Sequence, residues 1–237
     1  MSGGAFAELR VVAASGMAFE ARIAAAAGVR TVAGGLDPRR LADALEREAA
    51  LGACGIISFG VAGGLVAALL PGTWVVGRGV VTPAGYYACD AAWSAALRER
   101  LRDARFENIA GTDAPVTEPA AKRALHRATA AFAVDNESHV VAAVAAAHRL
   151  PFVAFRVVAD PVDRALPAAA MAAVGTGGTV DVAAALWALL RAPAQLPLLV
   201  RTALDARTAV RELLRGRRLL GARLGFAGLR ALELDVA

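Results

Sequence analysis

The order of apolar and polar positions predicts strands that alternate with helices along most of the chain. Apolar runs of strand length occupy residues 8–15, 55–59, 73–81 and 152–160, and a short strand with a loop is expected at 107–113. Segments of helical composition or spacing lie at 17–28, 39–52, 91–105, 119–132, 140–150 and, apart from 175–178, 168–191. We interpret 61–64 as a turn and 65–70 as a short helix or loop. This alternation predicts a single three-layer α/β domain with a central mixed, largely parallel sheet.

One uncharged stretch, residues 49–77, is long enough to cross a bilayer as a helix. Seven glycines and Pro71 interrupt it, and breakers at that density divide it into pieces of strand length. Charged residues from Glu8 to Arg22 interrupt the amino-terminal region, so no signal peptide is expected. These patterns predict a cytoplasmic protein without a spanning helix.

The amino-acid composition excludes two further classes of protein. Apolar types make up 57% of the 237 residues, charged types make up 20%, and the formal net charge is +5. An intrinsically disordered chain carries far less apolar surface, so that class is excluded. Cys54 and Cys89 are the only cysteines, which excludes a disulfide scaffold and favours a reducing compartment.

The positive charge is concentrated near the end of the chain. Residues 201–230 hold eight arginines against Asp205 and Glu212. A helix from about 197 would place an apolar face opposite an arginine stripe, as in amphipathic helices that lie on membranes. We therefore divide the chain into a domain over 1–195 and an Arg-rich amphipathic extension over 196–237. Residues 197–218 are expected either to contact an anionic membrane peripherally or to pack on the sheet with a solvated basic face. Nucleic-acid binding is not expected, because interleaved aromatic residues are lacking.

Three acidic residues stand where α/β proteins build their sites. Glu20 follows a strand-to-turn junction, Glu137 precedes an apolar helix, and Asp160 ends the most apolar strand. Each is also explained as an ordinary carboxylate near a helix start or in a loop. Glu137 and His139 would not share one helical face and His148 lacks an obvious partner, so no metal site is expected. The glycine-rich run 60–64 fits neither of the common phosphate-binding patterns, so we interpret it as close backbone packing or as the wall of a ligand site.

Six sequence blocks then occur in one order with compatible spacing. They are SGMAFE (15–20), FGVAGGL (59–65), VGRGVVTPAGYYACD (76–90), AGTDAP (110–115), AVDNES (133–138) and PFVAFRVVADPVD (151–163). This series resembles the nucleoside phosphorylase and nucleosidase superfamily, above all its methylthioadenosine/S-adenosylhomocysteine nucleosidase branch, over about residues 10–190. Within the superfamily it is most similar to the hopanoid-associated phosphorylase group, in the AFEARIAA segment, the NES sequence and the Arg-rich tail. The resemblance implies a nucleoside phosphorylase-like fold.

The resemblance also implies roles for the matching residues. Glu20 matches the acid that activates the nucleophilic water, and Asp160 matches the acid that helps to protonate the purine N7. Glu137 matches the residue that holds the ribose hydroxyls, and Asn136 takes the place of a ribose-lining Met. The base pocket or glycine-rich wall would comprise Val61, Ala62, Gly63, Thr112, Asp113 and Ala114. Pro115 stands where the family has a stacking Phe, which puts base stacking in doubt.

The implied reaction is cleavage of a purine N-ribosyl bond with release of adenine. A carboxylate stabilises the oxocarbenium-like sugar, and a carboxylic acid protonates the leaving base. Water and phosphate both remain open as nucleophile: Glu20 would repel a phosphate dianion, while the group's name favours phosphorolysis. No cofactor is expected, although phosphate would be a co-substrate in the second case.

The resemblance to the hopanoid group implies adenosylhopane as the substrate, a nucleoside with a polycyclic lipid at C5′. The expected location is then the cytoplasm or the inner face of the membrane. One alternative is a soluble nucleosidase for methylthioadenosine or S-adenosylhomocysteine. Another is a non-catalytic ligand-binding or membrane-associated protein on the same scaffold. The family commonly forms dimers or larger assemblies, so a homo-oligomer is expected.

Overall fold

The computed structural model describes residues 10–35, 37–175 and 178–226. The strands are β1 (Arg10–Ser15), β2 (Val29–Ala33), β3 (Ala53–Gly64), β4 (Trp74–Thr82), β5 (Gly85–Ala88), β6 (Arg105–Gly111), β7 (Ala133–Asp135) and β8 (Phe152–Asp160). The helices are α1 (Ala18–Ala24), α2 (Pro38–Ala50), α3 (Ala91–Arg100), α4 (Pro119–Thr129), α5 (Ser138–Ala147), α6 (Ala168–Ala172), α7 (Val182–Arg191), the short 3-10 helix η2 (Pro193–Gln195) and α8 (Leu196–Leu220). The last eleven residues of the predicted extension, 227–237, lie outside the described residues.

All eight strands belong to one mixed sheet. The main order is β2-β1-β3-β7-β6-β4-β5, and β8 pairs with both β3 and β4. The pairings β3–β8–β4–β6–β7–β3 therefore form a closed ring, with β1, β2 and β5 outside it. Of the eight strand pairings, five are parallel, as the predicted largely parallel sheet requires.

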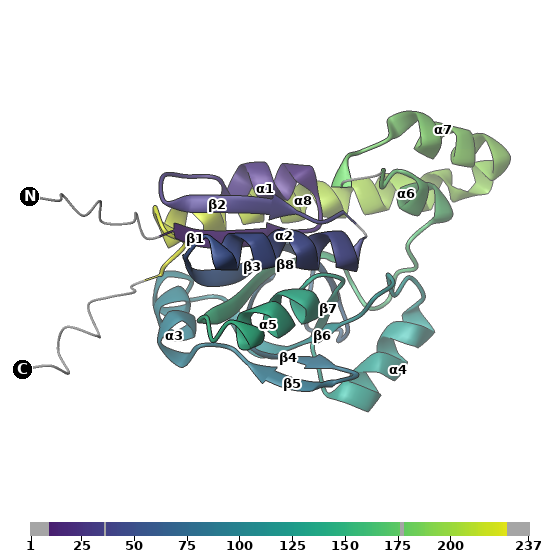
Figure 1. The fold of residues 1–237 in the computed structure, drawn as a ribbon. Helices are drawn as coiled ribbons and strands as arrows, with labels where there is room; N and C mark the ends of the chain where they lie inside the picture. The colour runs from purple at the N-terminus through teal and green to yellow at the C-terminus, as the bar shows by residue number, and fades with distance from the viewer. Residues whose placement is uncertain (1–9, 36, 176–177, 227–237) are drawn as a thin grey trace, which may run out of the picture.

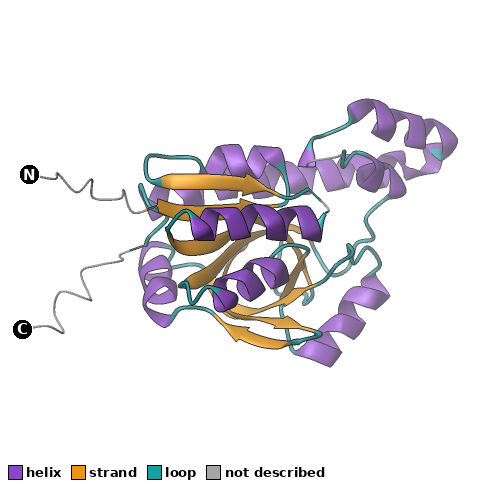
Figure 2. Ribbon diagram, viewed as in Figure 1, coloured by secondary structure: helices purple, strands orange, loops and turns teal. Residues whose placement is uncertain are grey.

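Helices cover both faces of the sheet, which confirms the predicted three-layer α/β class (Figure 2). Successive residues of β1 pack alternately into the two helical layers, because successive strand side chains point to opposite faces of the sheet. Val12 and Ala14 pack with α2 and α5, while Val11 and Ala13 share a second core with α1, α3 and α8. Small side chains fill much of this core, as the alanine-rich sequence requires.

Several predicted boundaries were wrong. The segment 61–64, interpreted as a turn, is the end of the long strand β3. Residues 65–70 form a loop with turns, which is one of the two forms predicted for them. The helix expected at 17–28 ends at Ala24, and three strands were not predicted: β2, β5 and β7. These strands have three to five residues and depend on pairing with other strands, which the periodicity of a short segment does not record.

The predicted carboxy-terminal helix exists as α8, and its two halves differ. In its second half Ala209, Leu213, Gly216 and Leu220 are buried, and the Trp74 Nε1 group donates a hydrogen bond to the Glu212 carbonyl at 3.0 Å. The first half extends from the body with α7, which projects at the upper right of Figure 1. No single described helix is long and apolar enough to cross a membrane; α7 and the η2–α8 stretch meet that test only together, across a bend of 116°.

Candidate active site

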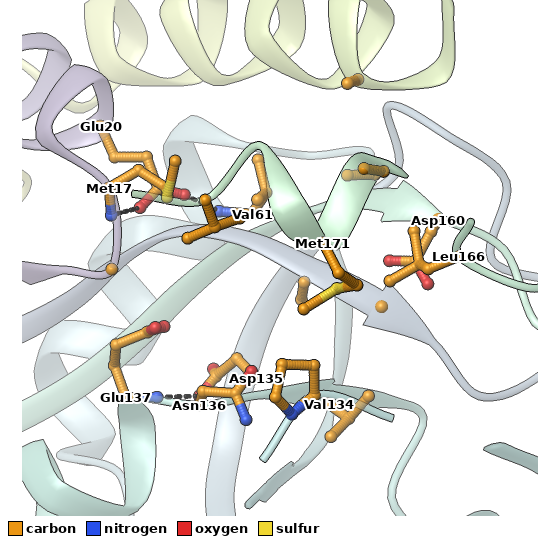
Figure 3. Close-up of a pocket in the computed structure, with 18 of the residues that line it drawn as sticks. Met17, Glu20, Val61, Val134, Asp135, Asn136, Glu137, Asp160, Leu166 and Met171 are labelled. Atoms are coloured by element: carbon orange, nitrogen blue, oxygen red, sulfur yellow. Dashed lines mark hydrogen bonds between the residues drawn. The ribbon is translucent and has the colours of Figure 1, made fainter. Parts of the chain in front are cut away.

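A cavity of about 300 Å³ lies where the ends of β1, β3, β7 and β8 meet the helices α6 and α8 (Figure 3). Four carboxylates line it: Glu20, Asp135, Glu137 and Asp160. Its other wall is apolar, with Leu166, Ala170, Met171 and Val174 on the α6 side and Ala206 beside Thr202 on α8. The lining, which is drawn from the described residues, contains no basic side chain.

Glu20 stands in the first turn of α1, directly after β1, and its side chain is 2% exposed. Its Oε2 atom accepts a hydrogen bond from the Met17 N–H at 2.8 Å, and Oε1 accepts one from the Val61 N–H at 2.7 Å. Burial raises the pKa of Glu20, although Arg156 and the backbone N–H groups lower it. The carboxyl group is thus held in place by the start of its own helix and by β3, at a position 41 residues further along the chain.

Arg156 lies fully buried in the middle of β8, among three carboxylates. Its Nε atom is 2.8 Å from Asp135 Oδ2, and its Nη2 atom is 3.1 Å from Glu137 Oε2. Nη2 also donates to the Ser58 hydroxyl at 2.5 Å, and Nη1 donates to the Val61 carbonyl at 3.3 Å. We call Glu20, Asp135, Glu137 and Arg156 the carboxylate cluster.

The cluster carries more acidic groups than basic ones, and Glu137 shows the effect. Burial raises the pKa of Glu137 to about 8; Asp135 and Glu20 add to the rise, and Arg156 opposes it. Glu137 is consequently a weaker acid than an ordinary glutamate, although it lies beside Arg156. Glycines make room for these side chains: a Cβ built on Gly16 would lie 2.9 Å from Glu137 Cδ, and one on Gly60 would lie 2.7 Å from Glu20 Cδ.

Asp160 ends β8 at another part of the cavity and is paired with Lys122 of α4. The Lys122 ammonium is fully buried, contacts Asp160 Oδ2, and donates to the Pro161 and Arg164 carbonyls at 3.1 and 2.9 Å. Its three N–H donors are therefore all used. Burial raises the pKa of Asp160, and Lys122 lowers it.

Seven of the ten predicted site residues line this one cavity: Glu20, Val61, Ala62, Gly63, Asn136, Glu137 and Asp160. Thr112, Asp113 and Ala114 do not, contrary to their predicted place in the base pocket. The Thr112 carbonyl accepts from Asn136 Nδ2 at 2.7 Å, the exposed Asp113 carboxylate pairs with His139, and the Ala114 carbonyl accepts from Thr112 Oγ1. From this loop, Pro115 reaches the cavity instead.

Three charged residues of the site were missed in the sequence: Asp135, Arg156 and Lys122. Two signals pointed to the basic ones. Arg156 interrupts an otherwise apolar strand, which is typical of a buried and paired charge, and Lys122 is the only lysine in the chain. Asp135 carries no comparable signal, because its role depends on the packing of β7 against β3 and β6.

Comparison with known structures supports the fold. A 5′-methylthioadenosine/S-adenosylhomocysteine nucleosidase from S. pneumoniae, solved with a transition-state inhibitor, matches 90% of this chain and 100% of its own, with a TM-score of 0.64 and 15% identity. The S-adenosylhomocysteine nucleosidase from Streptococcus pyogenes matches 90% and 98%, with a TM-score of 0.62 and 16% identity. A futalosine hydrolase mutant from Helicobacter pylori matches 66% and 90%, with a TM-score of 0.60 and 17% identity. At these identities the likeness shows the fold.

A sequence model of the phosphorylase superfamily matches residues 10–192, while no protein of curated function matches the chain. The match includes the cavity residues contributed by the strands, together with Lys122 and α6. It thus covers most of the chain and most of the candidate site. This chain belongs to the phosphorylase superfamily, as an enzyme of N-glycosidic bond cleavage.

Proposed function

We propose that this enzyme hydrolyses the N-ribosyl bond of an adenosine that carries a large apolar group at C5′, with adenosylhopane as its substrate. The observation that carries the proposal is a cavity that combines four carboxylates with an apolar wall. The carboxylates suit the reaction, and the wall suits the substituent.

The two ends of the cavity suit different steps of the reaction. Asp160, whose pKa is raised by burial, is suited to give a proton to the leaving purine, so that the base departs neutral. Each Glu20 oxygen already accepts one backbone N–H and keeps a second lone pair for a water molecule. The carboxylate cluster stabilises positive charge that develops on the ribose, as paired carboxylates do in glycoside hydrolysis. Glu137 and Asn136 are then suited to hold the ribose hydroxyls.

The charges around the cavity favour water over phosphate as the nucleophile. A phosphate dianion needs cationic or N–H donors around it. Arg156 is committed to Asp135, Glu137, Ser58 and Val61, and the three donors of Lys122 are also occupied. Glu20 would meet the dianion with another negative charge.

The size of the cavity suits a substrate that is only partly enclosed. About 300 Å³ is at the lower end of the range for small-molecule pockets, so a nucleoside with a polycyclic substituent must extend beyond it. The apolar wall formed by Leu166, Met171 and Val174 offers the substituent a path along α6.

The test is adenine release from two nucleosides, 5′-methylthioadenosine and an adenosine bearing a long alkyl chain at C5′, each with and without inorganic phosphate. We expect kcat/KM to be at least about tenfold higher for the alkyl substrate, because several additional methylenes become buried. We also expect a 5-substituted ribose with a free anomeric hydroxyl as the sugar product in both buffers. Faster turnover of methylthioadenosine would reject the lipid substrate, and a sugar phosphate formed only with phosphate would reject hydrolysis.

A second candidate is a soluble nucleosidase for methylthioadenosine or S-adenosylhomocysteine. The named activities of the structures with a similar fold favour it. The same competition between the two nucleosides separates it from our proposal.

A further inference from the structure

The projecting helix α7 and the first half of α8 leave seven large apolar side chains exposed. Val182, Leu186, Trp187 and Leu190 belong to α7, and Leu196, Val200 and Leu204 belong to α8. Each of the seven is between 50 and 74% exposed, and every residue of α7 is at least partly exposed. We call these seven residues the outer apolar strip. Monomeric proteins rarely expose so many large apolar side chains on two consecutive helices, so the strip indicates an interaction surface.

The strip and the cavity lie on opposite sides of the same helix. Leu196, Val200 and Leu204 recur every four residues and share one side of α8. Thr202 and Ala206, which line the cavity, are each two positions from a strip residue, about 200° around the helix. The first half of α8 is therefore a wall one helix thick between the strip and the site.

Positive charge surrounds the strip. Arg191, Arg201, Arg207 and Arg211 are exposed on α7 and α8. The nearby Asp205 is already paired with Arg164, whereas Glu212 lies 3.8 Å from the Arg211 Nε atom and offsets part of this charge. The Arg191 guanidinium lies 4.9 Å from the centre of the Trp187 ring. Tryptophan and arginine beside aliphatic residues are typical of segments at the boundary between lipid and water.

We propose that the outer apolar strip docks onto the surface of an anionic phospholipid bilayer. Its leucines and Trp187 enter the boundary between headgroups and acyl chains, and the arginines contact the lipid phosphates. The 116° bend between the two helical stretches suits a segment that lies on the membrane. A second copy of the chain is a poorer fit, because a two-fold contact through the strip would bring the same arginines together.

Docking would place the wall of the site at the lipid from which an apolar nucleoside must be taken. This last step rests on the proposed function, whereas the docking itself does not. The surface differs from the one expected from the sequence, since the apolar face of the second half of α8 is buried against the sheet.

The test is co-sedimentation of the full chain with sucrose-loaded phosphatidylcholine vesicles, with and without phosphatidylglycerol. We expect binding to the anionic vesicles that weakens with added salt. The triple variant Leu186→Ser, Trp187→Ser, Leu190→Ser should lower the partition coefficient at least about tenfold, because three anchoring side chains are lost. The matched control is Leu51→Ser with Leu70→Ser, two equally exposed leucines elsewhere (63 and 64%), which should bind as the unchanged chain does.

Two results would overturn the proposal. One is equal binding of the triple variant and the unchanged chain. The other is an unchanged chain that does not bind anionic vesicles but forms an oligomer that the triple variant does not form. That result would show that the strip contacts a second copy of the chain. Adenine release from a water-soluble nucleoside, measured on the same samples, reports on the proposed function separately. We expect the triple variant to keep that activity, because its three positions lie outside the cavity lining.

Discussion

The carboxylate cluster and the outer apolar strip treat charge and apolar surface in opposite ways. In the cluster, Arg156 of β8 is fully buried and held by partners from β3, from β7 and from Glu137, which follows β7. In the strip, apolar side chains are in water and Arg201, Arg207 and Arg211 stand exposed around them. The first region is organised before any ligand arrives, which is what electrostatic catalysis requires. The second is organised for a partner that the chain itself does not supply.

The largest expected difference between the two regions concerns activity. Asp160→Asn removes the proposed general acid and should lower kcat/KM about 10²–10⁴-fold, measured as adenine release. The control is Asp181→Asn in the projecting helices, where the side chain only caps α7 and Asn caps equally well. Activity of Asp160→Asn within twofold of the unchanged chain would contradict the proposed mechanism.

The loss of an arginine should cost much more stability in the carboxylate cluster than beside the outer apolar strip. Arg156→Met leaves Asp135 and Glu137 buried without their cation, and we expect a loss of about 3–5 kcal/mol in the free energy of unfolding. Arg201→Met, at an exposed position, should change it by less than about 0.5 kcal/mol. Denaturant titration of both variants measures the difference, and equal losses would mean that Arg156 is not the centre of the cluster.

The cluster should also make stability depend on pH. The pKa of Glu137 is about 8 in the folded chain and near its ordinary value of 4.5 when unfolded, so the folded state binds the extra proton between these values. The free energy of unfolding should therefore fall as the pH rises from about 4.5 to about 8. Glu137→Gln should flatten this slope in thermal melts across that range, whereas Asp181→Asn should leave it unchanged.

The smallest effect is expected at Lys122. Because Lys122 lowers the pKa of Asp160, Lys122→Met should raise it and move the alkaline limb of the kcat/KM profile to higher pH. Arg123→Met, which removes an exposed cation one position along α4, should leave the limb in place. A limb that stays fixed or moves downward in Lys122→Met would show that this ammonium does not tune Asp160.

The sequence predicted the parts of the fold that local patterns govern. Strands β1 and β8, helix α2 and the layered class all follow from apolar runs and helical spacing. The three-residue strand β7 could not be predicted, because only its pairing with β3 and β6 makes it a strand. The continuation of β3 through its glycines was hidden for the same reason, since Gly63 and Gly64 pair with Val134 and Ala133.

The candidate site also has residues that the sequence could identify and residues that it could not. Glu20, Glu137 and Asp160 could be found because a resemblance marked them. Their cationic partners Arg156 and Lys122 are 19 and 38 positions from Glu137 and Asp160, and only the folded chain shows which charge meets which. The sequence also could not predict that apolar side chains of α7 are exposed. A helix face that packs on the protein core and one that faces a binding partner have the same apolar spacing in the sequence.

The burial of Lys122 has a practical consequence for labelling. It is the only lysine of the chain, so amine-selective reagents have a single side-chain target. In the native fold that target is enclosed beneath the Asp160 loop, and its reaction requires the loop to open. The rate of acylation of Lys122 would then measure how often the structure opens locally at the Asp160 end of the cavity, without any introduced probe.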